Sequence, residues 1–429
     1  MLRNKRTYLI PIIGFAFIIL VASIILCLPV CNYKEITFRD ALFTATSGLT
    51  TTGFTKGPLV EQFNFWGQII LAILMEIGAM GFIIFVSYFW SIKNKKMKMS
   101  DILVINDNIS SDSYGQIKEH SIFIGKIMLE VQAFGIILLA IRFIPLLGFF
   151  KGIWYSIFHT ISAFSNCGFD LFGGSSLRIF ANDIYTQFIM IALMLLGSIG
   201  ILVIEDVRNN KSRKFSRLKL QTKIILTYSL ILLVVPTIAI KILEPNISIL
   251  NSLFMVSTSR STGFSVVDLP NFTFESKFIF IILMFIGGSP TSTSGGVKMV
   301  TIAVLISTIV STLKGKDETI MFWKKIPNSA IRRAITIFML FALIITIACT
   351  VFYHYNRINL LNIIFEAVSA ISNTGLTITD YSTVNIIGEN ILLLLMFIGR
   401  VSPLSFVLVF INENSKDKYI DYPSENVIL

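Results

Sequence analysis

Apolar runs about as long as a bilayer is thick recur along this chain and constrain its fold more than any other feature. Examples are residues 10–29, 65–92 and 224–240, which contain almost no charge. A helix of roughly 20 apolar residues crosses a hydrocarbon core. Because 54% of the 429 residues are hydrophobic and only 14% are charged, the composition also argues against a water-soluble fold. The runs predict membrane-spanning helices.

The first run follows a basic segment, residues 2–6, and so has the outline of a secretory signal peptide. It continues for about 20 residues, longer than a signal-peptide core. Its end at residues 28–31 contains no pair of small residues that would form a cleavage site. We interpret this run as the first membrane helix.

Positive charge is concentrated between the apolar runs. The net charge of +11 raises the question of a nucleic-acid partner, but no basic face with interleaved aromatic residues occurs, so nucleic acid is not expected to bind. Short basic connections orient membrane helices, because lysine and arginine favour the cytoplasmic side. The basic segments assigned to that side are residues 3–6, 93–98, 208–219 and 314–333.

Hydropathy and loop length together predict eight spans. They cover residues 7–29, 66–92, 121–148, 184–205, 222–243, 277–312, 333–355 and 388–411. Each outer connection also holds an apolar segment that is too short to cross and reads as a re-entrant half-helix. These segments are residues 38–49, 154–164, 250–259 and 361–371. The predicted fold is an all-α integral membrane protein with four helix–pore loop–helix repeats in a pseudo-fourfold arrangement and both termini cytoplasmic.

A glycine motif follows every half-helix and is the strongest sign of an internal repeat. The four copies are Thr50, Thr51, Thr52 and Gly53; Ser165, Asn166, Cys167 and Gly168; Arg260, Ser261, Thr262 and Gly263; and Ser372, Asn373, Thr374 and Gly375. A second glycine recurs 24 to 29 residues later, at Gly78, Gly197, Gly287 and Gly399. Helix packing explains any one of these glycines, but it does not explain two landmarks in register four times.

The chemistry of the motif points to an ion filter. Glycine permits a backbone conformation that lets successive carbonyls turn toward an axis. Non-helical backbone at membrane depth persists only where it is buried or lines a water-filled path. Carbonyls from four such loops can replace the hydration shell of a cation, and half-helix C-termini add partial negative charge. The sequence therefore predicts a cation pore, with K⁺ at a filter built from backbone oxygens.

These motifs resemble the Trk/Ktr/HKT superfamily of K⁺ and Na⁺ transporters, most closely the Ktr B-type membrane subunit, over nearly the whole chain. The resemblance implies one filter glycine per repeat, and a glycine at position 53 implies K⁺ preference. The expected repeats are residues 1–98, 99–220 with a cytoplasmic loop, 221–315 and 316–412, followed by a cytoplasmic tail, 413–429.

The third repeat carries a run of glycine, serine and threonine that no ordinary span tolerates. It comprises Gly287, Gly288, Ser289, Pro290, Thr291, Ser292, Thr293, Ser294, Gly295 and Gly296, with Lys298 at its end. By resemblance, residues 287–298 form a mobile intramembrane gate below the filter. A merely kinked helix is the alternative.

Arg400 occupies the register of the second glycine landmark in the fourth repeat, inside an apolar run. A lone intramembrane cation is costly and usually functional; snorkelling to an interface is the alternative. The resemblance places Arg400 in the pore beneath the filter, against the gate. Glu76 stands where relatives generally carry glutamine, and we expect it to face the pore, pair with a cation or be protonated.

The resemblance also implies partners and location. It predicts a homodimer in the plasma (inner) membrane, surrounded by lipid, with a cytosolic nucleotide-binding regulatory subunit of the Rossmann (RCK) type. Residues 93–118 and 208–223 are the expected docking segments. The transported ion is K⁺, with Na⁺ as a second candidate, and no organic cofactor is expected.

Three other functions are alternatives to a K⁺ pore. A Na⁺-coupled or Na⁺-permeable transporter of the same architecture is the nearest. An intramembrane enzyme is disfavoured, because the chain has no HExxH motif and no Ser/His pair at catalytic spacing. A membrane scaffold would not require the fourfold glycine register.

Overall fold

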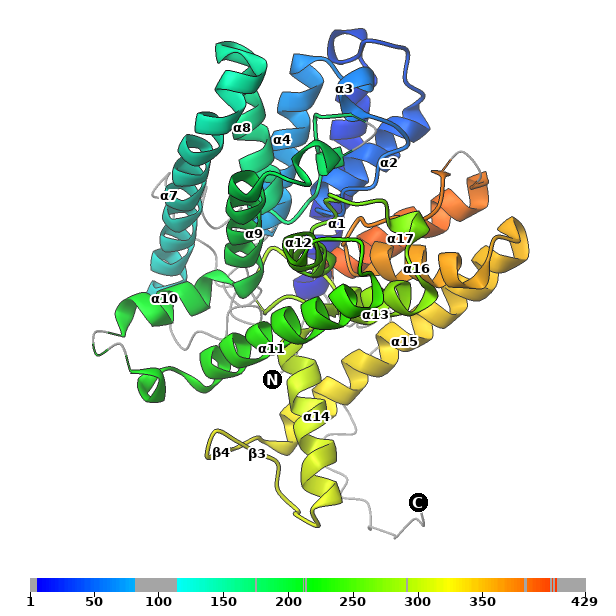
Figure 1. Ribbon diagram of the computed structural model, residues 1–429. Helices are drawn as coiled ribbons and strands as arrows, with labels where there is room; N and C mark the ends of the chain where they lie inside the picture. The colour runs from blue at the N-terminus through cyan, green and yellow to red at the C-terminus, as the bar shows by residue number, and fades with distance from the viewer. Residues whose placement is uncertain are drawn as a thin grey trace.

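In the part of the chain that it describes, the secondary structure of the computed structural model is helical apart from two pairs of two-residue strands (Figure 1). The structure describes residues 6–81, 114–173, 176–210, 212, 214–290, 292–381, 384–401, 403 and 406. Residues 93–98 of the predicted basic loop, gate residue Thr291 and the predicted tail 413–429 therefore lie outside the described residues.

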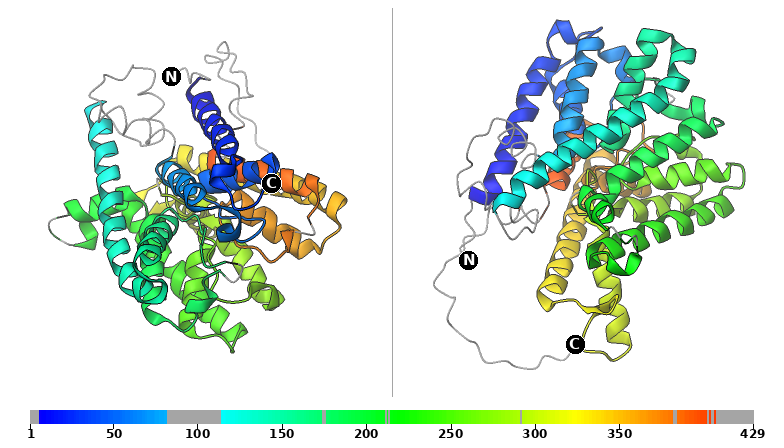
Figure 2. Two further views of the ribbon diagram at one scale, coloured as in Figure 1. Left: turned by 90° about the horizontal axis from the view of Figure 1, so that it is seen from above. Right: turned by 90° about the vertical axis from the view of Figure 1, so that its left-hand side faces the viewer.

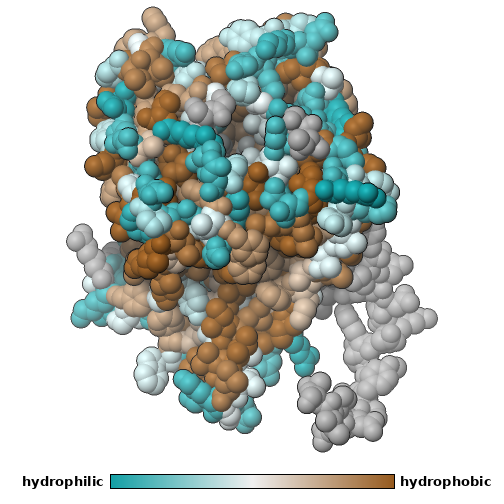
Figure 3. All heavy atoms as spheres, turned by 45° about the vertical axis from the view of Figure 1, so that its right-hand side comes forward, coloured by the Kyte–Doolittle hydropathy of each residue, from teal (hydrophilic) through white to brown (hydrophobic). Residues whose placement is uncertain are grey.

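Within the described residues, four long helices are apolar enough to cross a membrane, and a bent pair of helices, Ile184–Ile199 and Ile201–Asn209, passes the same test as one span. The four long helices are α1 (Arg6–Leu26), α7 (Tyr114–Leu147), α11 (Leu220–Leu243) and α15 (Asn328–Asn356). Only 22–33% of each apolar stretch is buried inside the protein, which is the reverse of a soluble core and suits a lipid-facing helix. Figure 3 shows hydrophobic side chains gathered over the lower half of one face. The prediction of an all-helical membrane protein agrees with this arrangement.

Four short helices follow the long ones and coincide with the predicted half-helices. They are α2 (Phe38–Leu49), α8 (Phe149–Phe164), α12 (Ile249–Ser259) and α16 (Leu360–Ile371). Three begin at side chains that accept a hydrogen bond from the first turn, namely Thr37, Ser248 and Asn359, as N-caps do. Most of the residues of each short helix are buried.

The second helix of each unit is α4 (Phe65–Met80), α9 (Ile184–Ile199) with α10 (Ile201–Asn209), α13 (Phe274–Phe285) with α14 (Met299–Leu313), or α17 (Ile386–Val401). The predicted span 66–92 is interrupted at residue 81, and its remainder, residues 82–92, lies outside the described residues. The predicted span 184–205 is bent and not one straight helix. Helix α4 ends at Gly81, whose φ is 73°, and α9 and α10 meet at 90° across Gly200, whose φ is 89°. Glycine adopts this left-handed conformation at little cost, so it ends the helix there.

In the third unit the second helix is interrupted where the glycine- and serine-rich run predicted a break. Strands β1 (Ile286–Gly287) and β2 (Val297–Lys298) pair in parallel and close the intervening segment into a loop. The sequence did not predict this strand pair, because two residues are too few to give a periodic signal.

Helix packing closes the four units into a ring. Each long helix packs on the short helix of its own unit, as α1 on α2 and α7 on α8. The second helix of each unit packs on the short helix of the next: α4 on α8, α9 on α12, α13 on α16 and α17 on α2. Figure 2 shows the units surrounding a common centre when viewed from above.

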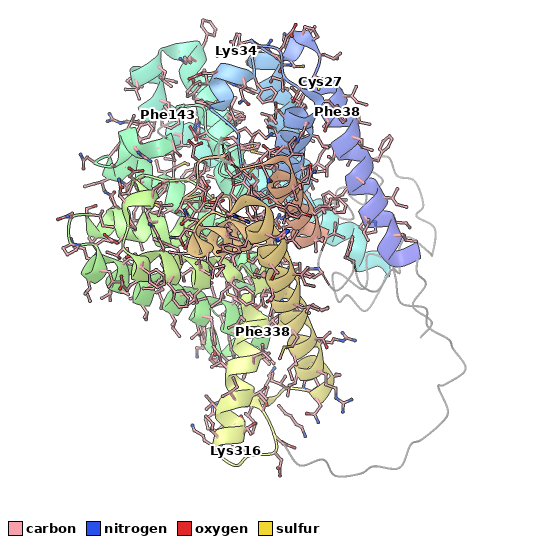
Figure 4. All side chains as sticks on the ribbon, turned by 90° about the vertical axis from the view of Figure 1, so that its right-hand side faces the viewer. Cys27, Lys34, Phe38, Phe143, Lys316 and Phe338 are labelled. Atoms are coloured by element: carbon pink, nitrogen blue, oxygen red, sulfur yellow. The ribbon has the colours of Figure 1, made fainter. Side chains whose placement is uncertain are left out.

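The remaining elements are short. They are η1 (Pro29–Cys31), α3 (Leu59–Gln62), η2 (Ser176–Phe180), η3 (Phe215–Arg217), η4 (Leu269–Asn271), β3 (Ile320–Met321) and β4 (Lys324–Lys325). Figure 4 shows Cys27 and Lys34 at one end and Lys316, beyond α14, at the other.

Candidate functional site

The four glycine loops share one unusual backbone conformation. The residue two before each glycine has a positive φ: 54° at Thr51, 54° at Asn166, 91° at Ser261 and 50° at Asn373. The glycines follow with φ of 92°, 80°, 97° and 80° at Gly53, Gly168, Gly263 and Gly375. Positive φ is uncommon for residues with a side chain, so its recurrence at one register position shows that the surrounding structure imposes it.

The loops lean on one another in cyclic order. A Cβ added to Gly53 would come within 3.0 Å of the Cys167 carbonyl oxygen. A Cβ on each of the other three glycines would strike the same carbonyl of the next loop, for the pairs Gly168 and Thr262, Gly263 and Thr374, and Gly375 and Thr52. The structure thus brings all four predicted glycines to one ring, in which no glycine has room for a side chain.

Backbone N–H groups in the loops point back into the short helices. The N–H of Thr52 donates to Ser47 O at 2.8 Å, and that of Thr374 donates to Ser369 O at 2.9 Å. Cys167 does the same with Ser162 O at 2.9 Å. Because these N–H groups bond to the short helices, the carbonyl oxygens of the same residues face the ring. A ring of carbonyls next to helix C-termini suits a dehydrated cation.

A cavity of about 280 Å³ opens on one side of the ring and is lined by all four glycines. Asp170 and Arg178 contribute its charged side chains, and Arg178 pairs with Asp268 at 2.6 Å. In the first unit, Lys56 forms an ion pair with Asp40 at 2.6 Å. Asp40 and Asp268 therefore each have a basic partner.

On the opposite side of the ring lies the glycine- and serine-rich loop between β1 and β2. Its Ser289 N–H donates to Ser198 O at 3.0 Å, and the Ser289 hydroxyl donates to Ile199 O at 2.5 Å. Thr293 Oγ1 lies 2.6 Å from the Asn166 amide, and the Gly295 N–H donates to Ser261 Oγ at 3.0 Å. The loop thus contacts the glycine loops directly.

Arg400 joins this loop to the first unit. Its guanidinium donates to Thr293 O and to Gly78 O. Lys298 Nζ donates to Ser294 O at 2.5 Å. Among the described residues, no carboxylate lies within ion-pair distance of Arg400 or Lys298. Two cations without a carboxylate partner below a carbonyl ring would oppose the passage of another cation.

Arg260 is placed differently from the other predicted loop residues. Its side chain is 1% exposed and points away from the ring, to Ser229 on α11. The guanidinium donates to Ser229 O at 3.4 Å and to Ser229 Oγ at 3.3 Å. Glu76, on α4, accepts a hydrogen bond from Gln132 of α7 at 2.5 Å, so the partner of Glu76 among the described residues is an amide.

Sequence reasoning missed a serine six residues before every ring glycine: Ser47, Ser162, Ser257 and Ser369. The hydroxyls of Ser162 and Ser369 each donate at 2.7 Å to the carbonyl of the residue after the glycine, Phe169 and Leu376 respectively. Aligning the half-helices as well as the loops would have exposed this third landmark.

These features define a membrane protein in which a single chain surrounds a candidate cation pathway. On one side of the carbonyl ring, the loop between β1 and β2 lies together with the charged side chains of Arg400 and Lys298. The chain belongs to the TrkH family, described as cation transport proteins, whose model matches residues 12–422.

Several relatives align with nearly the whole chain. The potassium/sodium uptake protein NtpJ of Enterococcus hirae is 31% identical, over 97% of this chain and 95% of its own length. The Ktr system potassium uptake protein B of Bacillus subtilis is 30% identical, over 95% and 94%. The crystal structure of the potassium transporter TrkH from Vibrio parahaemolyticus superposes with a TM-score of 0.78 at 17% identity, covering 96% of this chain and 86% of that one. That likeness shows the shared fold.

Proposed function

We propose that this chain is the ion-translocating subunit of a Ktr/Trk-type system and takes up K⁺ through a gated pore in the plasma membrane. The observation that carries the proposal is the ring in which each glycine abuts the carbonyl of the next loop. Relatives named as potassium uptake proteins over nearly their full length support K⁺ as the ion. Residues 50–53, 165–168, 260–263 and 372–375 would form the filter, through backbone oxygens.

Control of the pore is assigned to the loop 287–298 and Arg400. The loop lies against the filter loops, and Arg400 ties it to Gly78 of another unit. Release of these contacts would clear the pathway. Because freed backbone groups inside a membrane need partners, a polar loop can move only where water or protein replaces its hydrogen bonds.

The proposal includes eight crossings with cytoplasmic termini and the repeat boundaries at residues 98, 220, 315 and 412. The four long helices supply one crossing each, and the second helices of the four units supply the others. The name of the Ktr relatives supports additional subunits; a homodimer and a nucleotide-binding cytosolic regulator are the proposed partners.

A Na⁺-permeable or Na⁺-coupled transporter is the second candidate, favoured by the relative named as a potassium/sodium uptake protein. Flux of K⁺ and Na⁺ into liposomes, each measured with and without the other ion, separates the two. K⁺ uptake that needs no Na⁺ and exceeds Na⁺ uptake supports the leading proposal.

Replacing Gly53 by Ser tests the filter assignment. A side chain there is strained at a φ of 92° and collides with the Cys167 carbonyl, so the K⁺/Na⁺ flux ratio should fall by about tenfold, which corresponds to ~1.4 kcal/mol. Gly315→Ser is the matched control, because Gly315 has a φ of 65° but no described atom near its Cβ position. An unchanged ratio in Gly53→Ser contradicts the filter assignment.

A further inference from the structure

One register position behind the ring carries a different residue in each unit. Nine residues before the glycines stand Thr44, His159, Phe254 and Glu366. All four side chains lie on the short helices and are at most 2% exposed. A buried carboxylate and a buried imidazole at equivalent places need polar partners, because a buried polar group without one is costly.

Glu366 finds its partners in the loop that follows Gly375. Its Oε1 accepts hydrogen bonds from the Thr377 hydroxyl at 2.8 Å and from the N–H groups of Ile378 and Thr379 at 2.9 and 3.1 Å. Its Oε2 accepts from the Tyr381 hydroxyl at 3.0 Å. One carboxylate thus fixes four donors between residues 377 and 381, in the segment that follows the glycine.

Tyr381 carries this network across to the first unit. Its ring meets the rings of Phe43 and Phe54 edge to face, with centroids 6.0 and 5.4 Å apart, a favourable arrangement for aromatic pairs. Phe54 directly follows Gly53. The network therefore crosses the joint between the last and first units, where Gly375 abuts the Thr52 carbonyl.

His159 performs the equivalent task in the second unit. Its Nε2 accepts a hydrogen bond from the Leu171 N–H at 3.3 Å, while Nδ1 lies 2.7 Å from Tyr155 O. Leu171 is three residues after Gly168, as Ile378 is three after Gly375. Tyr155 also donates its hydroxyl to Leu171 O at 2.9 Å, so both backbone groups of Leu171 are held.

The other two units use different supports. In the first unit the residue three after the glycine is Lys56, held through its side chain by Asp40 at 2.6 Å and Glu389 at 2.8 Å. Thr44 turns its hydroxyl to Asp40 O of its own helix at 2.9 Å. In the third unit Phe254 has no polar atom to offer, and that loop instead contacts the gate through Ser261 and Gly295.

We propose that Glu366 and His159 are positioning residues of the filter: by fixing the third residue after the glycine, they hold the carbonyl ring at the spacing that discriminates K⁺ from Na⁺. This inference rests on the proposed function. Coordination by backbone carbonyls is sensitive to the geometry and stiffness of the loops that present them. A carboxylate with four donors is a stiff support, since hydrogen bonds to charged groups are stronger than neutral ones.

The test compares K⁺/Na⁺ flux ratios of purified full-length protein in liposomes for Glu366→Leu, Glu366→Gln and Thr44→Val. Leucine removes every acceptor and should lower the ratio by about tenfold. Glutamine keeps Oε1 for three donors and can donate its amide to the Tyr381 oxygen, so the ratio should return to within about threefold of wild type. Thr44→Val, at the same register, should leave the ratio unchanged.

The ratio separates positioning from folding, because a loss of folded protein lowers K⁺ and Na⁺ flux alike. A Glu366→Leu ratio equal to wild type, or an equal fall in Thr44→Val, overturns the proposal. If Glu366→Leu yields no active protein, Tyr381→Phe and His159→Leu replace it. Each of these variants should lower the K⁺/Na⁺ flux ratio at least about twofold. A ratio that is unchanged in both variants contradicts the positioning role. Wild-type protein that does not favour K⁺ contradicts the proposed function instead.

Discussion

Arg400 shows how a single side chain can lock two units together. It spans from the Thr293 carbonyl in the gate loop to the Gly78 carbonyl of the first unit, and a guanidinium suits this because its donors are fixed in a planar fork. The charge of Arg400 inside an apolar run was evident from the sequence. Its two carbonyl partners were not, because they belong to units 322 and 107 residues away along the chain.

Replacing Arg400 by Ala should raise basal K⁺ flux several-fold, since the substitution removes both the cation below the ring and the link to the loop. Flux into liposomes without any partner subunit is the measurement. Arg400→Lys separates the two effects, because lysine keeps the charge and loses the bidentate reach. Equal basal flux in wild type and Arg400→Ala would show that Arg400 does not close the pathway.

In the proposed filter loops, the sequence predicted the positions of the glycines but not the orientation of every side chain. Their glycines were found from a fourfold period. The direction in which the Arg260 side chain points could not be predicted from the sequence. Only the packing of the folded chain turns it toward Ser229 on α11 and away from the ring.

Helix ends are the elements that sequence patterns described least well. The sequence predicted one helix over residues 184–205, whereas Gly200 ends α9 and the chain turns there by 90°. Hydropathy could not reveal the bend, since the residues immediately before and after Gly200, 199 and 201–204, are all apolar. The half-helices were predicted well because their caps and short apolar lengths are local features.

Gly200→Ala should disturb the gate. Its φ of 89° costs a residue with a side chain ~1–2 kcal/mol, and the new Cβ would run into the Ser289 hydroxyl. Displacing Ser289 breaks its bond to Ile199 O, so basal K⁺ flux should rise. Gly148→Ala is the control: the φ of Gly148 is 85°, but no described atom lies within 4 Å of its Cβ position. A similar rise in the control would assign the effect to strain alone.

Asp183 should stabilise the start of α9 in a pH-dependent way. Burial alone would raise the pKa of this carboxyl, but hydrogen bonds from Arg142 and Thr186 lower it below the ordinary value of 3.8. A lowered pKa means that the stabilisation is complete above about pH 3.8 and is lost as the pH falls through the folded-state pKa.

Asp183→Ala removes both the cap and the ion pair and should cost about 1–2 kcal/mol at pH 7. Asp183→Asn keeps a capping oxygen and should cost less. Thermal unfolding in detergent at pH 7 and near pH 3.5 measures both differences. The part due to charge should shrink at the lower pH, and a difference that grows there would contradict the role given to Asp183.

At the scale of the whole molecule, the order of units in the ring follows the order of the chain. The repeats predicted this closure in outline, and the contacts of α17 with α2 supply the joint. Which glycine leans on which carbonyl depends on the sense of rotation around the axis. Sequence spacing carries no information on that sense, because both directions give the same intervals.

Deleting residues 289–294 tests whether the loop between β1 and β2 blocks the pathway. Its contacts reach three other units, through Thr51, Ile199 and Arg400, so removal should raise K⁺ flux strongly in liposomes. Deleting residues 320–325, the β3–β4 pair at the far end of α14, is the control and should leave basal flux unchanged. Unaltered flux after the first deletion would identify the loop as a passive break in the helix.

Building the ring from one chain has a consequence for how it is controlled. In a channel assembled from four identical subunits, an arginine beneath the filter would appear four times, and four like charges around one axis would repel each other and every arriving cation. Here Arg400 and the gate loop each occur once. A ring built from one chain can therefore carry a single arginine and a single proposed gate loop. Each of the four repeats can also change its sequence without changing the other three.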